Sequence, residues 1–462
     1  MMVTKQLSKV FQSFFFDQIS ITPLIVFRII FGVMLFFGTL RFIINGWVKQ
    51  LYIDPQYHFG YLGFEWVEKL PGNWMYLPFI IMLITAVLIS TGLFYRLAIV
   101  LFFINFSYIE LIDKSYYLNH YYFISLISFL LIWLPANQSF SLDSYRRKMA
   151  ITHIPAWCIN ILKFQIAVVY FFAGIAKINN DWLLLGEPLH TWLQAHHQIP
   201  LIGNLLKERW FAIGLSWVGM LYDIFIVFLL LSRKTRLIGY LFVIIFHVFT
   251  WYLFPIGIFP WVMILVTLIF FPSTFHSRLL DFFQSLKSKN KNLHINYYPE
   301  SINKKSLISF LLFSFILIQL AMPMRYLIYP GNLFWNEEGF RFSWRVMLMH
   351  KEGNATFYLI DNVSGGKTEI DNNQFLTSVQ QDQMATQPDM IIQYAQILSK
   401  YYKDKTFEYG GKKVKYEDFS VQADIRVSLN GRESQRFIKS DTDLSKVKYN
   451  LDHRNWVVPM IK

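Results

Sequence analysis

The sequence has only one cysteine, Cys158, among 462 residues, and it contains no CxxC pair, no HExxH motif and no cluster of carboxylates. Metal centres are commonly built from such groups, and an internal disulfide needs two cysteines. A GxGxxG segment that opens a βαβ unit and a GxxxxGKS or GxxxxGKT loop are also absent. We therefore expect no disulfide and no metal, and the sequence indicates neither a dinucleotide site nor a nucleoside triphosphate site.

Charged residues are scarce as well. They make up 16% of the chain, whereas hydrophobic residues make up 54% and aromatic residues 19%. A soluble domain typically carries about 25% charged residues. Nine apolar runs have roughly the length that a helix needs to cross a bilayer, namely 21–44, 76–93, 97–112, 119–134, 158–176, 211–231, 237–254, 256–271 and 307–323. The sequence predicts an α-helical integral membrane bundle of about nine transmembrane helices, so the lipid membrane is the first expected partner.

Lysine and arginine are distributed unevenly over the loops between these runs. Alternate loops, starting with the N-terminus, hold most of them: Lys5, Lys9, Arg96, Arg146, Arg147, Lys148, Arg233, Lys234, Arg236, Arg278, Lys287, Lys289, Lys291, Lys304 and Lys305. Positive charge marks cytoplasmic loops. We expect a multi-pass protein of the cell (inner) membrane with a cytoplasmic N-terminus. The net charge of +13 then belongs to topology and lipid contact, and no nucleic-acid partner is expected.

The composition changes after Pro323, where charged residues mix with short alternating segments. Residues 421–429 alternate as a strand does and run into Asn430-Gly431, a typical hairpin turn. A second hairpin is expected around Gly365-Gly366, and apolar residues at helical spacing follow Pro388. We expect a transmembrane domain over 1–324 and an extracytoplasmic α+β domain with a small antiparallel sheet over 325–462.

Lys177 ends the fifth apolar run, within Phe171 to Trp182. Lysine near the bilayer centre costs about 2.5–3.5 kcal/mol on insertion scales, so such a residue is a functional candidate, although a lysine at a helix end also snorkels to the interface. His120 opens the fourth run, at the same side, where the two residues can share a pocket. Taken alone, His120 fits a structural hydrogen bond as well as a catalytic role. Arg28, Asp223 and His247 also lie inside apolar runs, and for these three we favour structural pairing.

Four stretches, in order along the chain, resemble one family. They are Asp113-Lys114 with Asn119-His120, the tract from Phe171 to Trp182, Phe246-His247 with Leu253 to Phe259, and Phe342 to His350. These stretches resemble the vitamin K-dependent γ-glutamyl carboxylases, and most closely their bacterial homologues with an HTTM-type membrane domain. The resemblance covers most of the chain.

The resemblance implies an enzyme that oxygenates reduced vitamin K with O2 to the epoxide. The alkoxide formed on the way removes a proton from glutamate, and CO2 adds there. Lys177 would be the catalytic base that starts the reaction, since burial favours the neutral amine, and His120 would stabilise charge on the glutamyl side chain. The expected partner is a glutamate-containing peptide or protein. We expect seven further residues to bind substrate or support the site: Asn119, Asp181, Trp182, Arg28, His247, Trp344 and His350.

The chain also departs from the animal members. Ala176 stands where they have a second lysine, and Arg345 stands where they have an aspartate. One alternative is therefore a vitamin K epoxidase without carboxylation. The other is a non-enzymatic membrane protein, which binds quinone or carries ions through a relay of Lys177, Asp223 and Arg28.

Overall fold

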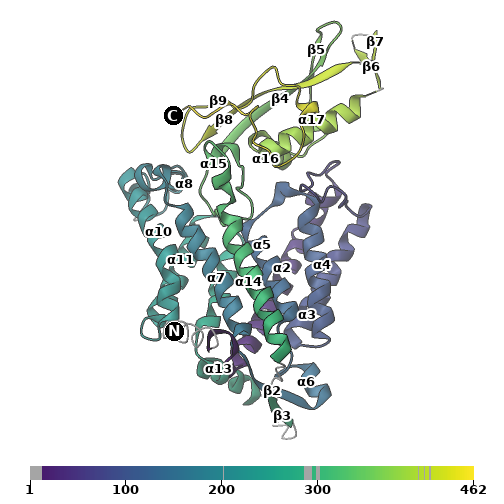
Figure 1. Cartoon of the computed structure of the whole chain (residues 1–462). Helices are drawn as coiled ribbons and strands as arrows, with labels where there is room; N and C mark the ends of the chain where they lie inside the picture. The colour runs from purple at the N-terminus through teal and green to yellow at the C-terminus, as the bar shows by residue number, and fades with distance from the viewer. Residues whose placement is uncertain are drawn as a thin grey trace.

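The computed structural model describes residues 13–200, 202–285, 294–297, 302–403, 405–409, 412–415 and 418–461. The basic loop expected at 287–292 lies outside these residues, as do Lys5 and Lys9. The described chain forms a bundle of long helices with a smaller α+β domain at one end (Figure 1).

Seven helices in the described part of the chain are long and apolar enough to cross a membrane. They are α2 (Thr22–Ile44), α3 (Tyr76–Thr91), α4 (Tyr95–Ile112), α7 (Trp157–Ala176), α10 (Arg209–Leu231), α11 (Arg236–Leu253) and α14 (Ile302–Met324). The chain is therefore a multi-pass membrane protein.

The two remaining predicted spans are helical but irregular. The fourth run forms α5 (Asn119–Trp133), an apolar helix shorter than the others. The eighth run forms α12 (Phe259–Val266) and a following turn, which meet α13 (Ser273–Ser285) at a bend of 112° beside Pro272. Proline ends a helix because its ring blocks the preceding turn. The count of nine spans is thus not confirmed, although a helix forms within each of the nine runs.

The two ends of the bundle differ in structure. At one end, β1 (Gln18–Ser20), β2 (Met149–Pro155) and β3 (His294–Tyr297) form a three-stranded sheet. The C-terminal domain lies at the opposite end (Figure 1). The N-terminal strand and the C-terminal domain therefore lie at opposite ends of the bundle, whereas the side of the membrane that each faces stays a prediction.

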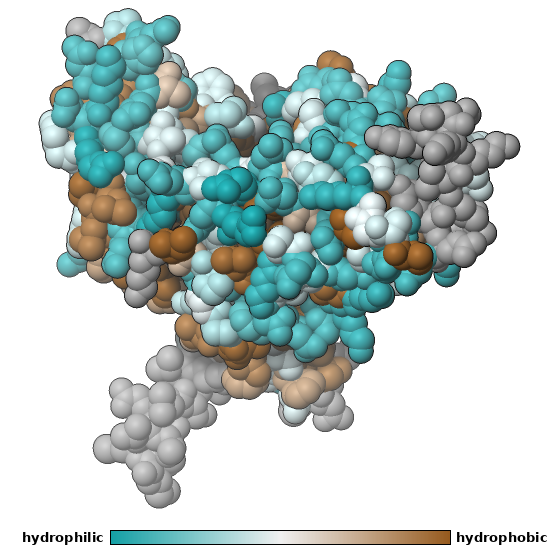
Figure 2. Space-filling model, turned by 90° about the horizontal axis from the view of Figure 1, so that it is seen from above, coloured by the Kyte–Doolittle hydropathy of each residue, from teal (hydrophilic) through white to brown (hydrophobic). Residues whose placement is uncertain are grey.

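The C-terminal domain is built on a four-stranded antiparallel sheet of order β5-β4-β8-β9. Its strands are β4 (Lys351–Asp361), β5 (Lys367–Ile370), β8 (Phe419–Leu429) and β9 (Gln435–Arg436). Helices α16 (Ser378–Thr386) and α17 (Pro388–Tyr402) pack against it, and Phe357 of β4 contacts Tyr394 of α17 edge to face. Seen from this end, the surface is largely hydrophilic (Figure 2), as a domain in water requires.

Both predicted hairpins are confirmed. β4 pairs with β5 across Gly365-Gly366, and β8 pairs with β9 beyond Asn430 and Gly431, which have φ values of 52° and 74°. The helix predicted after Pro388 is α17, with the proline in its first turn. The small hairpin of β6 (Thr406–Tyr409) and β7 (Lys412–Lys415) was not anticipated. The proposed division at 324/325 coincides with the end of α14 and stays a prediction.

Short elements complete the described chain. They are α6 (Leu142–Arg147), α8 (Leu189–Gln194), α9 (Gly203–Leu206) and α15 (Leu333–Asn336). The connection from α7 to α10, which contains α8 and α9, lies at the same end of the bundle as the C-terminal domain (Figure 1).

Candidate functional site

Lys177 forms an ion pair with Asp223 inside the bundle. Its Nζ lies 2.5 Å from Asp223 Oδ2 and 3.3 Å from the carbonyl oxygen of Ala173, and both charged side chains are buried. Lys177 caps α7 and Asp223 lies in α10. The two helices approach closely at Gly174, where a Cβ atom would lie 2.6 Å from Ile224 Cγ1. Small residues allow such close helix contacts in membranes, and here the contact brings the two charges together.

The ion pair lines a cavity of about 650 Å³, which we call cavity A. Its walls come mainly from α7, α10 and α11 and are largely apolar. Several lining residues also face outward from the bundle: Val218 is 59% exposed, Phe225 53% and Ile245 54%. Cavity A therefore borders the lipid-facing surface between α10 and α11.

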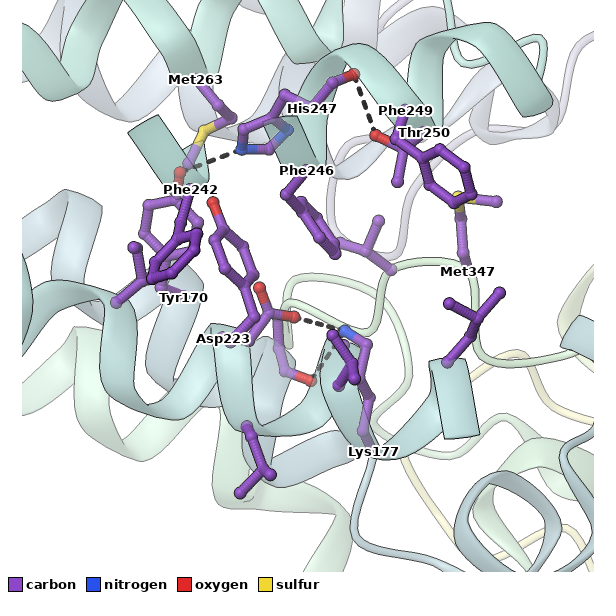
Figure 3. A pocket seen from close by; sticks show the side chains of 18 of the residues that line it. Tyr170, Lys177, Asp223, Phe242, Phe246, His247, Phe249, Thr250, Met263 and Met347 are labelled. Carbon is purple, nitrogen blue, oxygen red and sulfur yellow. Dashed lines mark hydrogen bonds and ion pairs between the residues drawn. The ribbon is translucent and has the colours of Figure 1, made fainter. Parts of the chain in front are cut away.

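A second polar group lies across cavity A from the ion pair (Figure 3). Tyr170 Oη lies 3.0 Å from His247 Nε2, and the ring of Tyr222 lies beside Tyr170 with ring centroids 6.0 Å apart. His247 is buried, and its Nδ1 has no hydrogen-bond partner among the described residues. A buried polar atom without a partner is costly, and a bound ligand can satisfy it. Cavity A thus has polar groups on two sides and apolar walls between them.

His120 lines a second cavity of about 770 Å³, cavity B. It is formed by α2, α4 and α5, the loop before α12 and Gln383 of α16, so it extends from the bundle to the C-terminal domain. Cavity B is more polar than cavity A, and its charged or hydrogen-bonding lining residues include Thr39, Arg41, Glu110, Ser115, Asn119, His120 and Gln383.

Lys177 and His120 do not share a pocket, contrary to the expectation from sequence. They line adjacent cavities whose common wall consists of Ile256, Phe259, Val346 and Met347. The Phe259 ring lies between two histidines, with its centroid 5.7 Å from that of His120 in cavity B and 5.9 Å from that of His247 in cavity A. Sequence reasoning placed both residues at the same end of the bundle but could not show that an aromatic wall separates them.

The part of the wall near Met347 belongs to an unusual backbone segment. Phe342, Trp344 and Met347 all have positive φ values between 53° and 60°, a conformation that is uncommon for bulky residues and clusters at functional sites. Asn119 holds this segment, because its Nδ2 donates to the carbonyl oxygen of Arg345 at 3.0 Å. Trp344 is buried and stacks on Tyr122 with centroids 4.8 Å apart. Asn119 and Trp344 therefore support the wall between the cavities.

Two clusters of charged groups join the bundle to the C-terminal domain. Asp181 accepts hydrogen bonds from Arg432 at 2.6 and 2.9 Å and from Asn430 at 2.8 Å. Burial alone would raise the pKa of Asp181, but these bonds hold it below its usual value. Lys114 pairs with Asp389 at 2.9 Å, and burial lowers the pKa of Lys114 to about 8. Asp181 is thus a link between the domains and lines neither cavity.

Of the remaining expected site residues, Trp182 lines cavity A and His350 does not. Trp182 lines cavity A, with its ring 5.5 Å from Lys177 Nζ and its Nε1 donating to the Ser216 carbonyl oxygen. His350 lies behind the cavity, because its Nδ1 accepts a hydrogen bond from Trp192, which lines cavity A.

The structure places Arg28, which was expected to support the site, away from both cavities. Arg28 donates to the carbonyl oxygens of Ile89, Ser90 and Phe140 and lines neither cavity. These partners belong to the end of α3 and the region after α5, far along the bundle from the C-terminal domain. The proposed relay of Lys177, Asp223 and Arg28 is therefore not formed: its first two members pair, and the third satisfies backbone carbonyls elsewhere.

Sequence reasoning missed several lining residues. Arg41 and Glu110 lie in apolar runs and face cavity B, so the rule that flagged Arg28 could have flagged them too. Tyr170 and Tyr222 carried no such signal, because tyrosine is common in membrane helices. Within the described ranges, no group of three or more His, Cys, Asp and Glu residues could hold a metal ion.

Comparison with known proteins adds two matches to this geometry. A family model described as the HTTM domain matches residues 16–275, more than half of the chain. A second model, described as the vitamin K-dependent gamma-carboxylase, lumenal domain, matches residues 304–462. The chain belongs to the vitamin K-dependent gamma-glutamyl carboxylase family. No solved structure matches it.

The two matches correspond to the two parts of the site. The HTTM match contains Lys177, Asp223, His120 and His247, and the match to the carboxylase domain contains Val346 and Met347 of the wall. The resemblance noted from sequence is thereby confirmed over both parts. Membership implies an enzyme of this family, and the family's name ties it to vitamin K.

Proposed function

We propose that this protein is a vitamin K hydroquinone-dependent γ-glutamyl carboxylase. The observation that carries the proposal is the Lys177–Asp223 ion pair in an apolar cavity that borders the lipid. Reduced vitamin K is a lipid-soluble bicyclic ring with a long apolar tail. Cavity A suits such a molecule, because it offers about 650 Å³ of apolar space and outward-facing walls through which a tail can extend.

The polar groups of cavity A fit a hydroquinone as well. Its two hydroxyl groups lie at opposite edges of one ring, and cavity A has polar groups on two sides. Lys177 and Asp223 would bind one hydroxyl. The unpartnered Nδ1 of His247 would bind near the other, with His247 oriented by Tyr170. When bound, reduced vitamin K supplies, on reaction with O2, a base strong enough to act on glutamate.

Lys177 and Asp223 together make a proton transfer possible at this depth. A lysine must be a free amine to accept a proton. Asp223 lies 2.5 Å from Lys177 Nζ and can hold the ammonium proton, which leaves a neutral amine beside a neutral carboxylic acid. The pair of side chains has no net charge either as ammonium and carboxylate or as amine and carboxylic acid. Lys177 would take the proton of the hydroquinone, and Asp223 would act as its positioning partner.

Cavity B would receive the glutamyl side chain. It extends to Gln383 of the C-terminal domain, where a peptide substrate in water can approach, and it touches cavity A through a single layer of side chains. His120 lines cavity B beside that layer and would stabilise charge that develops on the glutamyl group. CO2 would reach the same cavity. The C-terminal domain is predicted to be extracytoplasmic, so the peptide would reach cavity B from outside the cytoplasm.

Vitamin K epoxidation without carboxylation is the second candidate. Cavity A alone holds the polar groups that the quinone reaction needs, and all of them come from the bundle. A protein could therefore perform the first half of the reaction without any peptide.

The test is an assay of both products. Protein in lipid nanodiscs would receive reduced vitamin K, O2, bicarbonate and a glutamate-containing peptide, and both epoxide and carboxyglutamate would be measured. Lys177→Ala should abolish both. Lys163→Met is the matched control, because Lys163 lies on the same helix but lines neither cavity. Full epoxide formation by Lys177→Ala would refute the role of Lys177, and epoxide without carboxyglutamate in the unmodified protein would favour the second candidate.

A further inference from the structure

Arg41 is a cation of cavity B that has no hydrogen-bonding or ion-pair partner among the described residues. It lies in the last turn of α2, and its side chain lines the cavity that also contains His120. Within the described part of the chain, its guanidinium makes no hydrogen bond and no ion pair. A guanidinium carries five N–H donors, so all of them are available to a ligand.

Neighbouring groups fix the position of this guanidinium. It lies over the ring of Trp47, with its Cζ 4.8 Å from the ring centroid. On another side is Gly257, which has a φ of 64° and whose hypothetical Cβ would lie 3.5 Å from Arg41 Nη1. A larger residue at Gly257 would strain the backbone, because L side chains rarely adopt this positive φ, whereas its Cβ would meet Arg41 only at an ordinary van der Waals distance. The guanidinium thus lies between Trp47 and Gly257, and Ile256, the neighbour of Gly257, belongs to the wall between the two cavities.

Other arginines near the domain boundary are already occupied. Arg341 binds Asp389 and Arg432 binds Asp181. Arg28, in the same helix as Arg41, donates to three backbone carbonyl oxygens. Arg41 differs from these three, because its side chain is exposed, lines cavity B, and makes no hydrogen bond or ion pair among the described residues.

The ligand that suits Arg41 is a carboxylate. The planar guanidinium matches a carboxylate with two parallel hydrogen bonds. Glu110 also lines cavity B but forms no ion pair with Arg41, so no carboxylate of the described residues pairs with this guanidinium. A position at the end of a helix can also compensate the helix dipole. That role, however, does not require a place in the lining of cavity B.

We propose that Arg41 binds the side-chain carboxylate of the glutamyl substrate and thereby selects glutamate over glutamine. This inference rests on the proposed function, because it assigns the anion of cavity B to that substrate. Arg41 would act at one side of the cavity and His120 at another. Glutamine has nearly the same shape as glutamate but no charge, and it would leave the guanidinium unpaired.

The experiment compares the binding of two peptides that differ only in one residue, glutamate or glutamine. Dissociation constants would be measured by fluorescence anisotropy on protein in nanodiscs, without cofactor. A charged hydrogen bond contributes about 1.5–3 kcal/mol, so the unmodified protein should prefer the glutamate peptide roughly ten- to hundredfold. Arg41→Met should bind both peptides equally, and Arg41→Lys should keep part of the preference.

The control is Lys49→Met, since Lys49 is an exposed cation close in sequence that does not line cavity B. It should keep the full preference. Because the measurement is a ratio within one protein sample, partial loss of folded protein affects both peptides equally. An unchanged preference in Arg41→Met would overturn the assignment of Arg41 while leaving the proposed function intact. No preference in the unmodified protein, with normal epoxide formation, would overturn the inference and place the peptide site elsewhere.

Discussion

Lys177 and Asp223 form a buried ion pair of 2.5 Å between α7 and α10, in a cavity with largely apolar walls. Removing two charges from water is costly, and their mutual attraction offsets this cost only while both are present. The pair therefore makes each residue dependent on the other. Sequence reasoning named Asp181 as the acid that could depend on Lys177, but Asp181 binds Arg432 and Asn430 instead.

Removing Lys177 alone should destabilise the bundle. Lys177→Ala leaves the Asp223 carboxylate buried without a partner, and breaking one side of a buried pair typically costs about 3–5 kcal/mol. Lys177→Ala combined with Asp223→Leu removes both charges and should recover most of that stability. Thermal unfolding in one detergent would compare the three proteins. Equal melting temperatures for the single and double variants would show that the two groups do not depend on each other.

A small amine should restore part of the epoxidation lost in Lys177→Ala. The substitution leaves space beside Asp223, where methylamine can bind and accept a proton. Rescue should rise with pH, because the fraction of free amine rises. Tetramethylammonium is the control, since it can neutralise Asp223 but cannot accept a proton. Equal rescue by both cations would mean that Lys177 supplies only charge.

The sequence predicted the architecture better than it predicted the site. Long apolar runs, the alternation before Asn430-Gly431 and the position of Pro388 are local signals, and the helices and hairpins they predicted are present. The bend beside Pro272 and the length of α5 depend on packing, so the number of spans does not follow from the apolar runs alone. Lys177 and His120 were named as candidates from their motifs, whereas their separation by Phe259 comes from the contact of distant segments. The free-energy cost of placing a charge in a membrane helix is the same kind of signal for both arginines. It cannot distinguish Arg28, which donates to backbone carbonyl oxygens, from Arg41, which lines a cavity.

His120 and His247 should affect the two products differently. Both rings lie beside Phe259, but they face different cavities. His120→Ala should lower carboxyglutamate far more than epoxide, because only the second half of the reaction takes place in cavity B. His247→Ala should lower both products, since it alters cavity A. The ratio of the two products, measured in one assay, separates these outcomes, and an equal loss of both products in His120→Ala would place His120 with the quinone or the fold.

The direction of the chain across the membrane can be tested with reporters. The uneven distribution of lysine and arginine predicts that a reporter after Lys462 lies outside the cytoplasm and that one inserted at 287–292 lies inside it. The described strands β1, β2 and β3 form one sheet at the end of the bundle away from the C-terminal domain, so we expect a reporter joined before β1 to lie on the same side as one inserted before β3. Paired alkaline phosphatase and fluorescent protein fusions would measure all three positions. The same side for the C-terminal and 287–292 reporters would contradict the predicted topology.

Acid should weaken the contact between the bundle and the C-terminal domain. Burial raises the pKa of Asp389, but Arg341, Lys114 and Arg454 outweigh burial and hold it well below the usual 3.8. The pKa of Asp181 is also held below 3.8. A carboxyl group with a lowered pKa binds fewer protons in the folded state than in the unfolded state. Its contribution to stability is therefore complete above about pH 3.8 and is lost as pH falls through the lower pKa of the folded state.

The measurement is limited proteolysis of the C-terminal domain at a series of pH values from 6 downward, with an acid-active protease. Protection should be constant above about pH 3.8 and decrease below it. Asp181→Asn and Asp389→Asn should reduce protection already at pH 6, and their remaining protection should depend less on pH. Asp361→Asn is the control. Its carboxyl group also has a lowered pKa, through bonds to Ser364 and Val363, but it is the last residue of β4 and its printed bonds stay within the C-terminal domain. If Asp361→Asn changed the profile as much as Asp389→Asn, the acid sensitivity would belong to the folding of the C-terminal domain itself and not to its contact with the bundle.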